Sequence, residues 1–127
     1  MPFVRASVPD RFSDAQVARV SDAIHESMVE TFNVPADDRF QVISRHAPRE
    51  LVCSPSFLGI RHSADVVLVQ ITCSEGRSVE TKKALFTALA LSIARDGAVS
   101  PSDVIVNLVE VRRENWSFGD GLAQYAA

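Results

Sequence analysis

The spacing of apolar residues in the first third of the chain predicts a strand, a helix and a second strand. Residues 3–8 alternate between apolar and polar side chains, as in a strand with one buried face. A Ser-x-x-Gln capping-box pattern at residues 13–16 predicts a helix start. Asn33 and Pro35 end that helix, and extended character resumes at residues 40–44. The helix carries an apolar stripe at spacings of three and four: Val17, Val20, Ile24, Met28 and Phe32.

The second half of the chain repeats this plan. Residues 66–72 (VVLVQIT) are almost entirely apolar, which is typical of a central strand buried on both faces. Ser78 is the candidate N-cap of a second helix, and Gly97 and Pro101 end it. Residues 104–109 (VIVNLV) then form another apolar strand.

Two β-α-β units in tandem predict an α+β fold of the order β-α-β-β-α-β. We expect a single domain over residues 1–127, with pseudo-repeats at about 2–62 and 63–127. Right-handed crossovers place both helices on one face of a four-stranded mixed sheet. The strands supply more apolar side chains than two helices cover, so we expect oligomerisation with the sheets packed inward around an axis. A monomer with a polar, uncovered sheet face is the alternative.

The composition narrows the class of protein. Hydrophobic residues make up 46% and charged residues 23% of the 127, as is ordinary for a globular domain. The net charge of −3 argues against a nucleic-acid-binding protein, whose surface is normally basic. We expect no leader and no membrane span, because no apolar run approaches ~20 residues. Cys53 and Cys73 lack metal-site spacing, so we expect reduced thiols, a cytoplasmic location, no metal and no cofactor.

Pro2 is the first candidate for catalysis. If an aminopeptidase removes Met1, Pro2 becomes a terminal secondary amine. An α-amino group has a pKa of about 8 in water, and burial lowers it because burial disfavours the ammonium form. At the mouth of a pocket, such an amine acts as a general base near neutral pH or as a nucleophile towards carbonyl groups.

Arg77 and Asp38 are the next candidates. Arg77 directly precedes Ser78, so its guanidinium stands near the free N–H groups of a helix start, which is a favourable place for a carboxylate. In this fold the preceding strand ends beside the start of the first strand, and so beside Pro2. Asp37 and Asp38 follow the first helix. Either a carboxylate here orients the amine or a water molecule, or both residues serve turn and cap chemistry.

The segment after the last strand holds two aromatic residues and two glycines within residues 114–121. This composition predicts a tight hairpin. Its aromatic residues, Trp116 and Phe118, either pack across a subunit boundary or wall an apolar pocket. The three histidines form no triad and no metal spacing: His25, His46 and His62.

Together these segments resemble the tautomerase superfamily. The resemblance covers essentially the whole chain and is to the long, internally duplicated members, above all malonate semialdehyde decarboxylase and related tautomerase-like proteins. It implies a homotrimeric, barrel-like assembly with an active site around an amino-terminal proline at one end of each subunit. The residues that carry it are Pro2, Val34-Pro35-Ala36-Asp37-Asp38-Arg39-Phe40-Gln41, Ser44-Arg45-His46, Gly76-Arg77-Ser78 and Asn115-Trp116-Ser117-Phe118-Gly119.

The resemblance also implies roles for single residues. Pro2 matches the catalytic proline, and Asp38 matches the aspartate that works with it in a VPAxDR context. Arg77 matches the second of two pocket arginines that flank a proline. Glu75 falls at the position of the first arginine, with Gly76 between, so the Arg-Pro-Arg pattern is missing. This replacement changes the local charge by about two units and weakens the binding of a carboxylate nearby.

The combined prediction is a cofactor-independent keto–enol tautomerase, an isomerase, acting on a small 2-oxo or 2-hydroxydienoate carboxylate. Arg77 anchors the substrate, neutral Pro2 moves a proton, and Asp38 orients the amine or a water molecule. Apolar walls lower the pKa of the amine and nearby carboxylates raise it, so a cationic Pro2 acting as general acid stays open. The remaining substrate-binding residues are Glu75, Trp116 and Phe118.

Two other functions stay open. A lyase would decarboxylate a 3-oxo acid such as malonate semialdehyde, or hydrate an unsaturated acid, with Asp38 activating water. A non-catalytic trimer that binds small anions or partner proteins follows if Met1 is retained, because Pro2 is then an amide without basicity. For the enzyme we expect a small carboxylate substrate and a homotrimer, with no nucleic acid and no membrane as partners.

Overall fold

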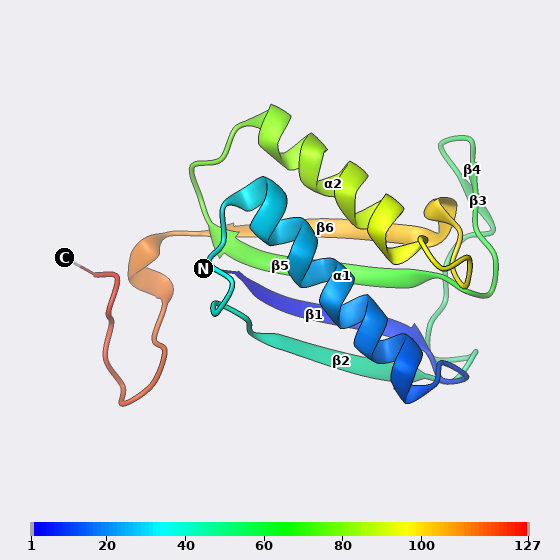
Figure 1. The fold of residues 1–127 in the computed structure, drawn as a ribbon, viewed down its shortest axis with the longest axis horizontal. Coiled ribbons are helices and arrows are strands. Elements are labelled where there is room, and N and C mark those ends of the chain that lie inside the picture. Colours follow the sequence, from blue (N-terminus) through cyan, green and yellow to red (C-terminus); the bar gives the residue numbers. More distant parts are fainter. Residues whose placement is uncertain (1, 127) are drawn as a thin grey trace.

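Two β-α-β units form one sheet with both helices on the same face (Figure 1). The computed structural model describes residues 2–126. It confirms the predicted β-α-β-β-α-β order and the four-stranded mixed sheet. The elements are β1 Phe3–Pro9, α1 Asp14–Phe32, β2 Gln41–His46, β3 Ser56–Phe57, β4 Ile60–Arg61, β5 Val67–Ser74, α2 Val79–Ile93 and β6 Val104–Val111, with 3-10 turns at Pro101–Asp103 and Arg113–Asn115.

The strand order β2-β1-β5-β6 brings the two repeats together through β1 and β5. Each repeat contributes a parallel pair, β1 with β2 and β5 with β6, whereas β1 and β5 are antiparallel. In this register Phe3 lies opposite Thr72, and Ser74 lies opposite Val111. The start of β1 and the ends of β5 and β6 therefore meet at one end of the sheet.

A side-chain cap at its start and a left-handed residue at its end set the bounds of α1. The Ser13 N–H donates to Gln16 Oε1 at 2.8 Å, and the Gln16 N–H donates to Ser13 Oγ at 3.1 Å, which is the predicted capping box. At the other end Asn33 takes the left-handed conformation with φ 56°, which asparagine tolerates, and so turns the chain out of the helix. The predicted N-cap of α2 is also present, since Ser78 Oγ accepts from the Thr81 N–H at 3.2 Å.

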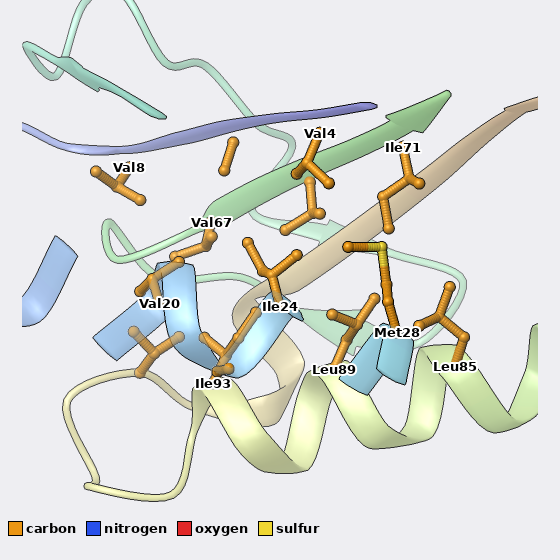
Figure 2. Packing of buried hydrophobic residues seen from close by; sticks show 14 of the residues in the cluster. Val4, Val8, Val20, Ile24, Met28, Val67, Ile71, Leu85, Leu89 and Ile93 are labelled. Atoms are coloured by element: carbon orange, nitrogen blue, oxygen red, sulfur yellow. The ribbon is translucent and has the colours of Figure 1, made fainter. Parts of the chain in front are cut away.

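The core lies between the sheet and the two helices. Figure 2 shows strand side chains such as Val4, Val67 and Ile71 pointing toward Ile24 and Met28 of α1. Four of the predicted stripe positions of α1, Val20, Ile24, Met28 and Phe32, are buried, and Val17 packs against the cluster. Fully buried apolar side chains also come from α2, namely Leu85 and Leu89.

The other face of the sheet is mixed in character. Leu68 and Ile105 are half-buried there, whereas Arg5, Gln70 and Asn107 on the same face are exposed. In the isolated subunit the central strand β5 is thus buried on one face only, which corrects the expectation that both faces would be buried. The reason is strict alternation, which sends every second side chain of β5 away from the helices.

The predicted hairpin at residues 114–121 was wrong. A short hairpin lies elsewhere in residues 2–126. Its two-residue strands, β3 and β4, are joined through Leu58 and Gly59, both at positive φ. Residues 114–121 instead follow the Arg113–Asn115 turn as a loop. Gln124 makes two hydrogen bonds to that loop. Its Oε1 accepts from the Phe118 N–H at 3.0 Å, and its Nε2 donates to the Gly119 carbonyl at 3.3 Å. The loop lacks the apolar alternation that strand pairing requires.

No helix within residues 2–126 has the length and apolar composition to cross a membrane. The cytoplasmic location and the boundaries of the two pseudo-repeats stay predictions.

Candidate active site

The functional candidates gather at one end of the sheet. Figure 1 shows the start of β1, the end of α1, the ends of β5 and β6 and the segment that follows β6 all at the left of the view. Antiparallel pairing of β1 with β5 produces this meeting, because it brings the start of the first repeat beside the end of the second repeat's first strand. The expected placement of Arg77 near Pro2 rests on this pairing.

Pro2 is fully buried, with less than 2% of its surface exposed. The Phe3–Thr72 pairing, continued by one residue, sets Pro2 beside Cys73 on the helix-covered face of the sheet. On the other side of β1 the Val4 N–H donates to the Phe40 carbonyl at 3.0 Å. The start of β1 is thus held from both sides. Met1 lies outside the described residues, so its removal stays a prediction.

Asp38 lies in the turn between α1 and β2. Its N–H donates to the Pro35 carbonyl at 3.0 Å, which closes the turn. Its Oδ1 is buried and has no hydrogen-bond partner among residues 2–126, whereas Asp37 is exposed. A buried carboxylate oxygen without a donor is costly and uncommon in folded proteins. Of the two aspartates, Asp38 is therefore the one with an unused acceptor for a ligand, a water molecule or an amine.

The Arg77 guanidinium contacts Phe32, the last residue of α1. Arg77 Cζ lies 4.3 Å from the centre of the Phe32 ring, a cation–π contact. Its Nη2 donates to the Phe32 carbonyl at 3.3 Å, and its Nη1 donates to the Ser74 carbonyl at 3.3 Å. The Phe32 carbonyl is one of the last four of α1, which lack partners within the helix. Arg77 is half-buried, and three of its five N–H groups are left for an anion.

Burial raises the pKa of the Cys73 thiol, and the charge of Glu110 raises it further. The positive charges of Arg77 and Lys82 partly offset this rise in pKa. Arg77 Nη1 donates to the carbonyl of Ser74, the residue after Cys73, so the guanidinium lies at the same end of β5 as the thiol. This end of the subunit therefore combines a buried proline with a nearby fixed cation.

Aromatic side chains cover one side of this region. Trp116 and Phe118 stack with ring centres 5.5 Å apart, and Phe118 contacts Phe40 at 6.1 Å and Tyr125 at 5.1 Å. The Trp116 Nε1–H donates to Ser74 Oγ at 3.1 Å, which attaches the stack to the end of β5. Trp116 and Phe118, the two aromatic residues predicted from the sequence, both lie here. Their role in substrate binding stays a prediction.

Glu75 stands apart from these contacts. Its side chain is exposed and forms no ion pair among residues 2–126, while its N–H donates to the Val111 carbonyl at 2.9 Å. Gly76 follows with φ 121°, a conformation that favours glycine. Sequence reasoning assigned no role in the site to Phe32, Phe40 or Cys73. Phe32 was expected in the apolar stripe of the first helix, Phe40 lay in a segment that carries the resemblance, and Cys73 was expected to be a reduced thiol.

The chain was compared with known proteins. A family model described as tautomerase enzyme matches residues 38–119, and another of the same description matches residues 2–59. Probable tautomerase YusQ of Bacillus subtilis (strain 168) is 36% identical over 124 residues, which cover 98% of each chain. Probable tautomerase YrdN of the same organism is 29% identical over 98% of this chain and 96% of its own length.

Solved structures of enzymes from the same family have the same fold as this chain. The FG41 malonate semialdehyde decarboxylase inhibited by 3-bromopropiolate has a TM-score of 0.91 and 36% identity, over 97% of this chain and 93% of its own. Another malonate semialdehyde decarboxylase, studied for its decarboxylase and hydratase activities, has a TM-score of 0.89 and 39% identity over 97% and 95%. A fused 4-OT trimer, at 19% identity and a TM-score of 0.78 over 94% of each chain, shares the fold. The chain is an enzyme that belongs to the tautomerase family.

Proposed function

We propose that the protein is a keto–enol tautomerase of a small 2-oxo or 2-hydroxydienoate carboxylate, with the amine of Pro2 as its general base. One observation carries the proposal. The buried Pro2 directly precedes Phe3, which pairs with Thr72 near the end of β5, and the Arg77 guanidinium donates to the carbonyl of Ser74 at the end of that strand. A base and a carboxylate anchor therefore belong to the same end of the subunit. That neither metal nor cofactor takes part stays a prediction.

Arg77 supplies the anchor in this mechanism. Its two hydrogen bonds to carbonyls are long, at 3.3 Å each, and leave its remaining N–H groups free to bind a carboxylate. The α2 N-terminus begins just beyond it at Val79, and its dipole favours an anion there. Both features orient the substrate so that its acidic carbon or enol oxygen faces Pro2.

Pro2 then takes a proton from one atom of the substrate and returns it to another. Burial and the cation of Arg77 lower the pKa of an amine at this position, and the carboxylate of Asp38 raises it. Glu75 is exposed, which weakens its opposing effect through solvent screening. The proposed mechanism uses the neutral amine, which is the form that acts as a base. The buried Asp38 Oδ1 is the acceptor that orients the amine or a water molecule.

A lyase is the second candidate, and two observations favour it. The two malonate semialdehyde decarboxylase structures are 36% and 39% identical to this chain. The unpartnered Asp38 Oδ1 is also suited to activating water, as decarboxylation coupled to hydration or hydration alone would require. Glu75, at the place of a pocket arginine, is the departure that favours tautomerisation over decarboxylation.

We propose a homotrimer as the working form. The half-buried Leu68 and Ile105 on the open sheet face are apolar surface that a partner would cover. A fused 4-OT of the same fold forms a symmetric trimer. A monomer with a free sheet face is the competing arrangement.

The experiment is ketonisation of phenylenolpyruvate by protein whose intact mass confirms the loss of Met1. Replacing Pro2 with alanine removes the secondary amine, and we expect kcat to fall by about 10²-fold or more. Replacing Arg77 with alanine should raise KM by about 10- to 100-fold, since a charge-assisted bond is lost. Arg19→Ala is the matched control, because Arg19 pairs with Asp96 on the exposed surface.

The same protein is tested for release of carbon dioxide from malonate semialdehyde. Decarboxylation without comparable ketonisation would replace the tautomerase by the lyase. Absence of both activities in correctly processed wild type would favour the anion-binding trimer.

A further inference from the structure

His25 is the buried histidine of α1 that the proposed chemistry does not use. Its side chain is 7% exposed, and its Nε2 lies 2.8 Å from the Ala36 carbonyl oxygen. A carbonyl oxygen only accepts hydrogen bonds, so Nε2 carries the proton. The Nδ1 atom is buried and has no partner among residues 2–126. Within residues 2–126 the imidazole therefore makes one hydrogen bond, and that bond reaches the loop after α1.

The bond ends inside the turn that presents Asp38. Ala36 is the second residue of the turn that the Asp38 N–H closes onto the Pro35 carbonyl at 3.0 Å. Pro35, Ala36 and Asp37 are all exposed, whereas Val34, directly before the turn, is buried in the core. The nearer backbone link, from the Val34 N–H to the Met28 carbonyl, is long at 3.4 Å. Beyond the turn, Arg39 Nη2 donates to Asp22 Oδ1 of α1 at 2.7 Å, so both ends of the turn are held. Among residues 2–126, the His25 contact is the side-chain hydrogen bond that reaches the interior of the turn, and it tethers the turn to α1.

One face of α1 serves both candidate groups. His25 and Phe32 are seven residues apart, which is two helical turns and puts them on the same face. Phe32 holds Arg77 through its ring and its carbonyl, and His25 holds the turn of Asp38 through Ala36. The separation between anchor and carboxylate is therefore set by a single rigid element.

We propose that His25 is a positioning residue that keeps the Asp38 carboxylate in its working place by fixing the Pro35–Asp38 turn. The proposal rests on the function proposed above, in which the carboxylate of Asp38 orients the Pro2 amine or a water molecule. His25 itself touches neither substrate nor reacting atoms. Its effect on the rate passes through Asp38.

Two amide variants separate the Nε2 contact from mere occupancy of the site. In His25→Gln the side-chain amide N–H reaches close to the position of Nε2, whereas in His25→Asn it reaches only the position of Nδ1. We expect kcat to fall by about 10- to 100-fold in His25→Asn and His25→Leu, as misplaced catalytic groups do, and to be largely kept in His25→Gln. KM should change little, because Arg77 is held independently by Phe32.

A double-mutant cycle tests whether the effect passes through Asp38. In an Asp38→Asn background the further change His25→Asn should cost almost nothing, since residues that act as one unit are not additive. A full additional loss in that background would overturn the proposal, and so would equal losses in the Gln and Leu variants.

Hydrogen exchange of the Asp38 amide gives a second readout that needs no activity. Its exchange should speed up in His25→Asn and His25→Leu and stay at the wild-type rate in His25→Gln. An unchanged rate in all three variants would refute the tether. If the wild type shows no ketonisation while exchange behaves as expected, the proposed function fails and the tether stands.

Discussion

At the scale of single residues, the site combines burial with a nearby cation. Cys73 reports this balance, because burial raises the pKa of its thiol while Arg77 and Lys82 act in the opposite direction. Since burial is the larger effect, the neutral thiol is the favoured form in the folded protein.

Thiol alkylation checks this balance. Cys53 is half-buried and Cys73 is buried, so iodoacetamide should label Cys53 first and Cys73 much more slowly at pH 7. A raised folded pKa contributes stability that is present below the unfolded pKa, about 8.5 for a thiol, and is lost as pH rises through the folded pKa. Because the thiolate is the form that reacts, labelling of Cys73 in a Cys53→Ser variant should rise only at pH values above about 8.5, the ordinary pKa of a thiol. Rapid labelling at pH 7 would contradict the assignment.

Trp116 is held by a single polar contact that can be tested alone. In Trp116→Phe the ring can still stack on Phe118, but the hydrogen bond from Nε1 to Ser74 Oγ is lost. We expect the free energy of unfolding to fall by about 0.5–1.5 kcal/mol in urea denaturation. Ser74→Ala should remove the same bond, so the double variant should lose less than the sum of the two. Additive losses would show that the bond contributes little.

At the scale of elements, α1 is the part that places the site. Its start is set by a capping box, and its end by the left-handed Asn33. The face that includes His25 and Phe32 reaches the turn of Asp38 and the guanidinium of Arg77. A shift of this helix would thus move both groups together.

The cap of α1 gives a stability prediction at this scale. Ser13→Ala removes the acceptor of the Gln16 N–H and should lower the free energy of unfolding by about 1 kcal/mol. Ser13→Gly is the matched control and should cost only a few tenths of a kcal/mol. Equal losses in thermal or urea unfolding would show that the hydroxyl does not act as a cap.

At the scale of the whole molecule, the sheet has one covered face and one open face. Alternation along β5 puts Val67, Val69 and Ile71 under the helices and leaves Leu68 on the other side. Leu68 of this central strand and Ile105 of β6 are the apolar surface through which we propose that subunits associate.

Sedimentation velocity of a charged variant tests the trimer. Leu68→Asp places a carboxylate in the proposed interface and should shift the protein from trimer to monomer at micromolar concentration, because an unpaired buried charge is strongly unfavourable. Leu91→Asp makes the same chemical change on α2, where Leu91 is 63% exposed, and should leave the trimer intact. A monomeric wild type, or an intact trimer of the Leu68 variant, would remove the basis of the proposal.

The sequence by itself determined the two helices and the four strands of the main sheet, and it supplied the candidates for the site, whereas the short β3–β4 hairpin was not predicted. Periods of two and of three to four, with caps at Ser13 and Ser78, are local patterns, and helix and strand bounds depend mainly on such local interactions. Pro2, Asp38 and Arg77 became candidates because each residue type suits its chemistry and because their segments resemble a known superfamily. The hairpin predicted at residues 114–121 failed, since turn-forming residues alone do not supply strands to pair.

Only the tertiary structure decided which groups share a place. Antiparallel pairing of β1 with β5 set Pro2 beside Cys73, the end of α1 held Arg77 through Phe32, and His25 reached Ala36 across 11 residues. It also left Glu75 exposed and Asp38 Oδ1 buried, although both are carboxylates in loops. Such contacts join residues that are distant along the chain. Their geometry depends on how the sheet and helices pack together, which local sequence patterns do not encode.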